Sequence, residues 1–572
     1  MRTSTELTPE LREFQALAEA RARDYGLDFF DTIFEVVDFD TMNQLATYGG
    51  FPVRYPHWRW GMEYEKLRKR DAYGLGRIYE MVINNDPCYA YLQESNSLMG
   101  QKLVMAHVYA HCDFFKCNAW FAHTPRNMMD QMANHAIRVQ RYIDRIGLEP
   151  VERFLDACLS LEHLIDPHSM FMRREAARHT RPPGSSTAPA GVSLGSADGD
   201  DRDVEVGNGR PGTISPGASG RDDPLSAAHR RQYSAENDDP DARPRRDDVW
   251  EPDRLPAKDY MDRFINPPEL LEKQRQAFEA ERQKSQRQFP DRPTRDVLLF
   301  LLRHAPLADW QRDILSMIRT EAYYFAPQAM TKIMNEGWAT YWHSKIMTNH
   351  LLEASEVIDY AEQHSGVVFM QAGGFNPYKI GVEIFKDIER RWDRGQHGPA
   401  WEALEGIGER EAWDDGSREG RDKMFQVRRI YNDVNFVEEY LTDELIHKLK
   451  LYHYRRDPRT GQMVIASRDP HVVRQTMLYR ISNMGQPFMY VADANYNNRG
   501  ELYLAHQWNG LEVDASKARE VLRNMVKLWG RPVHLQMRIQ DEMCLLTFDP
   551  DGNEVKVEKI TDGMPKPIHQ IE

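Results

Sequence analysis

Two histidines, His107 and His111, stand four residues apart in an apolar, aromatic segment that runs from Leu103 to Phe115. The segment predicts an α-helix, and on a helix this spacing puts both imidazoles on one face, about 6 Å apart along the axis. Two neutral imidazoles in that arrangement can bind one divalent metal ion, Zn²⁺ or another. The alternative is a pair of core histidines with local hydrogen bonds. The spacing alone does not decide between a metal site and this structural pair.

A catalytic metal site also needs a third protein ligand and an open coordination position. Glu336 and His343 are seven residues apart, about two helical turns, and share a helix face with Thr340. We expect one of Glu336 and His343 to be the further metal ligand. With His343 in that position, Glu336 is the catalytic carboxylate that takes a proton from metal-bound water. Gly337 costs a helix roughly 1 kcal/mol relative to alanine, so we expect another backbone or a ligand to approach closely there.

Residues 335–339, Asn-Glu-Gly-Trp-Ala, look like a degenerate zincin core. In the zincin pattern His-Glu-x-x-His, the two histidines bind the metal and the glutamate activates water. Here Asn335 and Ala339 occupy the histidine positions, whereas His107 and His111 keep the histidines and lack the glutamate. We therefore expect the two segments together to supply what one helix supplies in a zincin.

Other residues are weaker candidates for the site. The carboxylates of Glu80, Asp113 and Glu321 could bind metal, act as a base or orient a histidine. Asn376 before Pro377 predicts a helix start, whose amides together with Lys379 could bind an anionic group. The chain has no P-loop and no complete dinucleotide-binding glycine motif, so no nucleotide cofactor is expected.

Composition excludes several classes of protein. The chain is 41% hydrophobic and 10% aromatic, which is too apolar for a wholly disordered protein. A net charge of −14 argues against a nucleic-acid partner. Five cysteines without a CxxC pair predict a reducing compartment. Because there is no secretory signal and the apolar runs are too short to span a bilayer, we expect a soluble cytoplasmic protein without a transmembrane segment.

Helical periodicity over most of the chain, followed by strand-like segments near the end, predicts a mainly α core with a smaller C-terminal α+β domain. A zincin-like fold is one option for the core. A segment dominated by Gly, Pro, Ser, Asp and Arg interrupts the core and predicts disorder. We expect a first helical part with the histidine pair over 7–172, the disordered polar insert over 173–255, a second helical part over 256–450, and the α+β domain over 455–572.

Local signals give sharper expectations. The spacing of Ile78, Met81 and Val82 predicts a helix, and Pro327 predicts the break between two later helices. In the tail, short β-branched and aromatic segments predict strands, one hairpin turn is expected over 497–500, and a helix over 515–528.

Several long strings resemble the SpoVR family, which is named for stage V sporulation protein R. These strings are Asp86-Pro-Cys-Tyr-Ala-Tyr91, Lys102-Leu-Val-Met-Ala-His-Val-Tyr-Ala-His-Cys-Asp-Phe-Phe-Lys116, Asn335-Glu-Gly-Trp-Ala-Thr-Tyr-Trp-His343 and Gly374-Phe-Asn-Pro-Tyr-Lys-Ile-Gly-Val-Glu383. The resemblance runs from near residue 10 to near residue 560, apart from the polar insert.

The resemblance implies a cytoplasmic protein linked to formation of the spore cortex, a peptidoglycan layer, or to stress adaptation. It also implies a PrkA-type serine kinase and a von Willebrand-like protein as partners. The resemblance assigns no catalytic residue, so the metal hypothesis rests on the spacing of the histidines and the glutamate alone. Two interpretations follow: a metal-dependent hydrolase of amide or peptide bonds, or a non-catalytic regulator that binds the kinase or wall-synthesis proteins.

Overall fold

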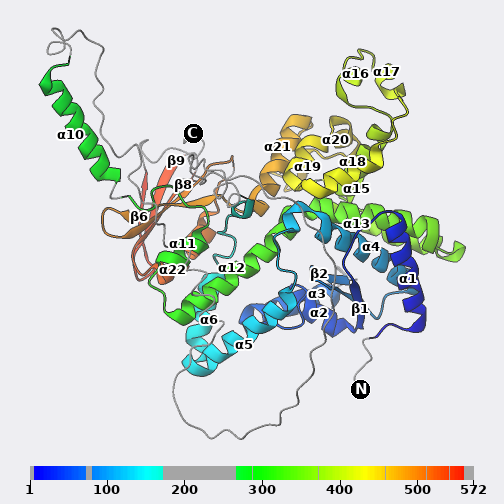
Figure 1. Ribbon diagram of the computed structural model, residues 1–572, viewed down its shortest axis with the longest axis horizontal. Helices are drawn as coiled ribbons and strands as arrows, with labels where there is room; N and C mark the ends of the chain where they lie inside the picture. Colours follow the sequence, from blue (N-terminus) through cyan, green and yellow to red (C-terminus); the bar gives the residue numbers. More distant parts are fainter. Residues whose placement is uncertain are drawn as a thin grey trace, which may run out of the picture. The chain divides into compact units, whose positions relative to one another are not determined.

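The computed structural model describes residues 6–72, 80–171, 266–285, 288–371, 373–457, 459–510, 512–539 and 542–559. This part is mainly helical and carries a C-terminal five-stranded sheet (Figure 1), which confirms the predicted fold class. The chain forms two compact units, one of residues 1–173 with 287–572 and one of residues 174–286. The insert predicted over 173–255 lies outside the described residues, and the domain boundaries drawn from composition stay predictions.

The first part of the chain contains helices and three short strands. They are α1 (Pro9–Asp24), β1 (Thr32–Val37), α2 (Phe39–Thr47), α3 (Trp58–Ala72), β2 (Glu80–Ile83), β3 (Cys88–Gln93), α4 (Leu98–Cys117), η1 (Ala119–Phe121), α5 (Met128–Ile146) and α6 (Leu148–Leu159). The second unit contributes α10 (Pro268–Ser285) to the description.

The remaining elements follow after residue 287. Those of the helical core are α11 (Val297–His304), α12 (Asp309–Met330), α13 (Lys332–Ile346), the π-helix η3 (Met347–Leu351), η4 (Ala354–Glu356), α14 (Val357–Val367), α15 (Pro377–Asp393), α16 (Gly398–Glu402), α17 (Ile407–Ala412), α18 (Gly420–Ile430), α19 (Asp433–Tyr440) and α20 (Asp443–Leu449). Those of the tail are β4 (His453–Arg456), β5 (Met463–Ser467), α21 (Pro470–Ile481), η5 (Ser482–Gly485), β6 (Met489–Tyr496), β7 (Glu501–His506), α22 (Ala515–Trp529), β8 (Val533–Ile539), β9 (Glu542–Phe548) and β10 (Glu554–Lys559).

The helix expected around Met81 and Val82 is wrong, because both residues lie in strand β2. β2 pairs antiparallel with β3, and β3 pairs parallel with β1, in a three-stranded sheet of order β1-β3-β2. A short apolar run can satisfy helical and strand patterns alike. Here β3, whose residues are almost all buried, supplies the backbone hydrogen-bonding partner that decides between them.

Helix α13 is the centre of the helical core, because it packs against both α4 and α15. Its contact with α15 is made between two glycines. A Cβ added at Gly337 would lie 2.4 Å from the backbone carbon of Gly381, and one added at Gly381 would lie 2.1 Å from the carbonyl oxygen of Ile333. The close backbone approach expected at Gly337 is thus confirmed, and a neighbouring helix makes it.

The break expected at Pro327 is displaced. Pro327 lies inside α12, and the chain leaves helical geometry only at Thr331, with φ −127° and ψ 19°. The carboxylate of Asp433 at the start of α19 accepts hydrogen bonds from the backbone N–H groups of Ile333 and Met334, at 2.8 and 2.9 Å. These bonds satisfy the first free amides of α13, so a residue about a hundred positions away fixes where α13 begins.

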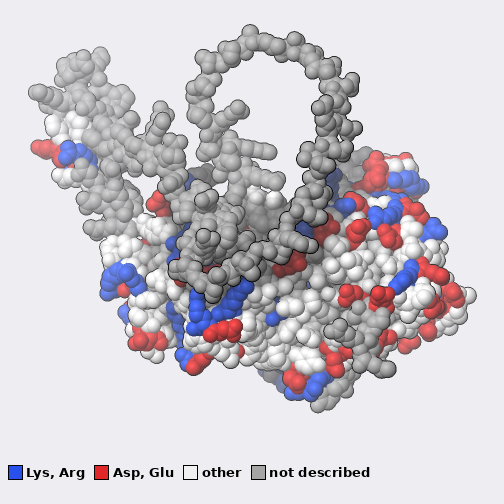
Figure 2. Space-filling model, turned by 60° about the horizontal axis from the view of Figure 1, so that its bottom comes forward, with Lys and Arg blue, Asp and Glu red and all other residues white. Residues whose placement is uncertain are grey.

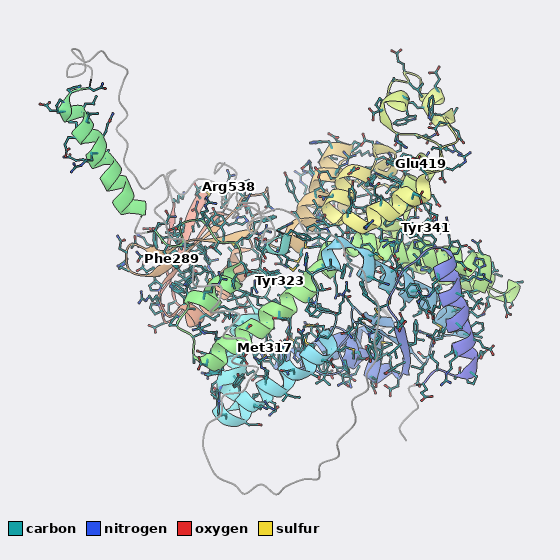
Figure 3. The ribbon with its side chains drawn as sticks, viewed as in Figure 1. Phe289, Met317, Tyr323, Tyr341, Glu419 and Arg538 are labelled. Carbon is teal, nitrogen blue, oxygen red and sulfur yellow. The ribbon has the colours of Figure 1, made fainter. Side chains whose placement is uncertain are left out.

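The C-terminal sheet has the order β10-β9-β8-β7-β6. β7 and β8 are parallel, joined through α22, and the other neighbours are antiparallel. The expected hairpin turn joins β6 and β7, with Asn497, Asn498 and Gly500 at positive φ. One sheet face shares a hydrophobic core with α6, α11, α12 and α22; Met317 and Tyr323 of α12, labelled in Figure 3, belong to or pack against that core.

None of the described helices is long and apolar enough to cross a bilayer. On the face drawn in Figure 2, lysine and arginine residues stand interspersed with aspartate and glutamate residues. The charge of that face is therefore mixed.

We predict that Gly381→Ala lowers the free energy of unfolding by about 1–3 kcal/mol or more, because its methyl group meets backbone atoms that cannot turn away. The matched control is Gly366→Ala in α14, where nothing lies within 4 Å of the added Cβ; it should be neutral or stabilise by up to about 1 kcal/mol. Chemical denaturation measures both. Equal effects of the two variants would contradict the glycine contact.

Candidate metal centre

Helix α4 presents the two histidines to the interior of the core. Ser97 caps its N-terminus by accepting a hydrogen bond from the N–H of Gly100, and seventeen of its twenty residues are buried. A helix that is buried on all sides belongs in the middle of a core. His107 and His111 are only 4 and 5% exposed, with ring centroids 4.5 Å apart.

Helix α13 brings Glu336 to the same place. Its Oε2 lies 3.7 Å from His107 Nε2 and 3.5 Å from His111 Nε2. The ligand-capable atoms of the three residues all lie within 4.8 Å of one another. The structure thus brings together the histidine pair and the carboxylate that sequence spacing selected from two distant segments.

These distances suit a metal ion better than a direct hydrogen bond. Oε2 of Glu336 is buried and has no hydrogen-bond partner among the described residues, although two imidazoles face it. Tetrahedral ligands about 2.1 Å from a metal ion stand about 3.4 Å apart, close to the separations seen here. A buried carboxylate oxygen left without a partner is costly, and an ion bound between the three groups would satisfy it.

The electrostatics keep His111 and Glu336 in the protonation states that bind a metal ion. Burial and, to a smaller extent, the neighbouring His107 lower the pKa of His111 to about 4, so this imidazole is neutral at pH 7. Burial by itself would raise the pKa of Glu336, but the contacts with His107 and His111 outweigh it and the net pKa is lowered. Neutral histidines and an ionised carboxylate are the forms that bind a divalent cation.

A hydrogen bond orients each imidazole. His111 Nδ1 lies 2.9 Å from Oδ1 of Asn335, an acceptor, which assigns the proton to Nδ1 and leaves the lone pair on Nε2 toward Glu336. His107 Nδ1 lies 2.8 Å from Nδ1 of His343. Partners of this kind fix the tautomer and the ring direction of metal-binding histidines.

His343 therefore does not occupy the position that sequence spacing suggested. It contacts His107 through Nδ1, on the ring edge opposite the Nε2 that faces Glu336, and it lies outside the three-residue group. Its own Nε2 lies 3.3 Å from Nδ1 of His364 in α14. Burial and the neighbouring His107 lower the pKa of His343 well below its usual value. In this geometry His343 orients His107.

The weaker carboxylate candidates lie outside the group. Asp113 is fully buried on another face of α4, where it accepts hydrogen bonds from the Asp28 N–H and the Trp338 indole, each at 2.8 Å. Burial raises the pKa of Asp113 to about 6. Glu321 belongs to a separate buried network, in which it contacts Arg54 at 2.7 Å and His135 at 2.9 Å. The side chain of Glu80 lies outside the described residues.

The Asn376-Pro377 start is confirmed as the N-terminus of α15. The Asn376 side chain accepts a hydrogen bond from the Lys379 N–H at 3.2 Å and donates to the carbonyls of Val367 and Phe369. Lys379 Nζ points to Glu383, with 3.5 Å between Nζ and Oε1. The anion site predicted for Asn376 and Lys379 stays a prediction at this point.

A cavity of about 590 Å³ lies elsewhere, lined by residues that include His57, Asp156, Arg523 and Lys527. None of the sequence-predicted site residues lines it. We place the candidate chemistry at the histidine–glutamate group, because among the described residues it is the group whose three ligand-type side chains lie close enough to hold one ion.

Sequence reasoning missed two partners. His364 comes from a helix with no metal-type spacing to any other histidine, so no local pattern could reveal it. Asn335 was read only as a lost ligand, yet it orients His111. The adjacency of Asn335 to Glu336 was the available signal, since an amide beside a candidate carboxylate is a natural hydrogen-bond partner for a histidine.

Comparisons with known proteins agree with this organisation. A family model described as SpoVR like protein matches residues 6–192 and 225–486, a range that contains the whole candidate site. A second model, described as SpoVR-like C-terminal domain, matches residues 487–540. Over 554 residues the chain is 27% identical to "Uncharacterized protein YcgB" of Escherichia coli K12, covering 91% of this chain and 90% of that protein. No solved structure matches.

We predict that the metal-free protein loses stability as the pH falls from about 6.5 toward 4. The pKa of His111 is about 4 when folded and 6.5 when unperturbed, so in this window the unfolded chain binds more protons and lower pH favours it. The measurement is the free energy of unfolding against pH for the wild type and His111→Gln, whose difference isolates this histidine. An identical pH slope in both proteins would contradict the assignment.

Proposed function

The chain belongs to the SpoVR family, and we propose that it is a metal-dependent hydrolase that acts on an amide or peptide bond. Its divalent ion, Zn²⁺ or a similar metal, is held by Nε2 of His107, Nε2 of His111 and the carboxylate of Glu336. The observation that carries the proposal is the unpartnered, buried Oε2 of Glu336 at 3.5 and 3.7 Å from the two imidazole nitrogens.

A set of two histidines and one glutamate is the donor set of several catalytic zinc sites, and it leaves a coordination position open to water. A divalent ion in such a set lowers the pKa of bound water toward neutrality. Structural zinc sites, in contrast, fill all four positions with protein ligands, commonly cysteines. The described residues offer no cysteine to this group, which favours a catalytic over a structural ion.

The chain's own residues divide the remaining work. Glu336 would hold the ion through Oε2, and its second carboxylate oxygen would be the group placed to accept a proton from a nearby water. His343 and Asn335 hold the two imidazoles in the required tautomers. Thr340 lies one helical turn from both Glu336 and His343, and its buried hydroxyl has no partner among the described residues. That hydroxyl is suited to hydrogen-bond the water or the substrate.

We propose cell-envelope metabolism, with peptidoglycan or a cytoplasmic precursor of it as the substrate, on the strength of the family alone. The alternative is a non-catalytic regulator that binds a PrkA-type serine kinase, a von Willebrand-like protein or wall-synthesis proteins. One observation favours such a partner: Ile358 and Phe369 are 79 and 65% exposed, and apolar side chains this open suit a contact surface.

Elemental analysis of the purified protein should find about one divalent metal ion per chain. The ion should be lost from His107→Ala, His111→Ala and Glu336→Gln variants, because each removes one of three ligands. His135→Gln is the matched control, since His135 is also buried against a glutamate, Glu321, but outside the group. Metal-free wild-type protein whose thermal stability does not change with added zinc would favour the regulator.

His343→Gln should weaken metal binding by roughly 10–100-fold without abolishing it, because it removes the group that orients His107. Competition with a chromogenic chelator measures the affinity. A complete loss, equal to that of His107→Ala, would instead assign His343 to the ligand set.

The metal-loaded protein should release new amino groups from soluble peptidoglycan fragments, and the metal-free protein should not. Glu336→Asp, which keeps a carboxylate, separates loss of the ion from loss of chemistry when metal content and rate are measured together. A fully metallated wild-type protein that is inactive on such fragments would rule out this substrate class.

A further inference from the structure

Three lysines converge on one carboxylate on the outer side of α15. Lys379, Glu383 and Lys386 stand at positions i, i+4 and i+7 of that helix, so they share a face. Lys448 joins them from α20. Oε2 of Glu383 lies 2.8 Å from Lys448 Nζ, and its Oε1 lies 3.5 Å from Lys379 Nζ and 3.9 Å from Lys386 Nζ. We call these four residues the lysine cluster.

The charges of the lysine cluster do not balance. Burial alone would raise the pKa of Glu383, but the hydrogen bond from Lys448 and the charges of Lys379 and Lys386 outweigh it and lower the pKa, so the carboxylate is ionised. No other described carboxylate forms an ion pair with the three ammonium groups. Three positive charges therefore share one negative charge, in a protein whose net charge is −14.

Such an arrangement leaves a local excess of positive charge, and like charges around one carboxylate repel one another. The lysine side chains are 30, 50 and 66% exposed, for Lys379, Lys386 and Lys448, so their ammonium groups can reach a ligand, whereas the Glu383 side chain is only 10% exposed. An oxyanion bound here would relieve the repulsion and accept several charge-assisted hydrogen bonds.

Apart from Lys448, the lysine cluster lies on the same helix that contacts the candidate metal centre. The ring of Tyr378, the residue before Lys379 on α15, stacks on that of His107 with the ring centroids 6.2 Å apart. Ring centroids are 5.0 Å apart from His107 to His343 and 5.5 Å apart from His343 to His364. Together, these two centroid distances are roughly the length of three extended residues of a peptide.

We propose that Lys379, Lys386 and Lys448 bind an anionic group of the substrate, a carboxylate or a phosphate, beside the metal centre. The substrate class is then a short acidic peptide or a phosphorylated conjugate, with its negative group a few residues from the bond that is cut. Its role in substrate binding rests on the proposed function, but the anion site itself does not need the metal.

The test is isothermal titration of the full-length, metal-free protein at low ionic strength with two probes. One is acetyl-Ala-Ala-Ala with a free C-terminal carboxylate, with its C-terminal amide as reference; the other is inorganic phosphate. At least one probe should bind, and Lys379→Gln/Lys386→Gln/Lys448→Gln should weaken binding at least about tenfold, since each lost charge-assisted hydrogen bond is worth about that factor. The probe that binds identifies the anion.

Two controls make the result specific. Lys345→Gln removes a lysine of α13 that is 38% exposed and paired with one carboxylate, Glu389, which also accepts a hydrogen bond from Tyr341, labelled in Figure 3. This variant should bind the probe as the wild type does. The triple lysine-to-arginine variant should keep binding, which separates loss of charge from loss of fold.

Failure of both probes to bind the wild type, or equal binding by the triple glutamine variant, would overturn the anion site. If Lys345→Gln weakens probe binding equally, the effect comes from the general surface charge, and the anion site is again overturned. Because the protein is metal-free throughout, none of these outcomes depends on the metal centre. If the metal-free protein binds a probe but elemental analysis finds no native ion, the hydrolase proposal fails and the anion site stands.

Discussion

The candidate site depends on one contact between two helices. Gly337 and Gly381 let α13 and α15 approach at backbone distance, and α13 is thereby held between α15 and α4. Glu336 is the residue next to Gly337, so the same contact sets how far the carboxylate stands from the histidines of α4. Asp433 fixes the other variable, the residue at which α13 begins. A few polar and glycine contacts thus position a donor set that no single helix contains.

Sequence reasoning succeeded where the cause is local. The helix start at Asn376-Pro377, the hairpin turn with Asn and Gly at positive φ, and the amphipathic helix at 515–528 all depend on neighbouring residues, and the structure confirms them. The spacing of His107 and His111, and that of Glu336 and Thr340, gave the right helix faces for the same reason. The resemblance of the long strings correctly predicted the family.

The errors have distant causes. β2 is a strand because β3 pairs with it, and the break lies after Pro327, where Asp433 caps the start of the next helix. The prediction of His343 as a metal ligand stays a prediction. Helical periodicity could place His343 on the right helix face, but it could not tell which ring edge of His107 this side chain would meet. The lysine cluster likewise needed α20 beside α15, whereas only Lys379 could be picked out from its place in a helix start.

The donor set also has a consequence for synthesis of the chain. His111 and Asn335, the neighbour of Glu336, are 224 residues apart. At about 5–20 residues per second, a ribosome needs roughly 10–45 s to pass from one to the other. During that interval the two imidazoles of the nascent chain lack their carboxylate. If the chain binds the proposed ion, tight binding would have to wait until the later helix has been made, and the metals present at that moment would decide which ion is taken up.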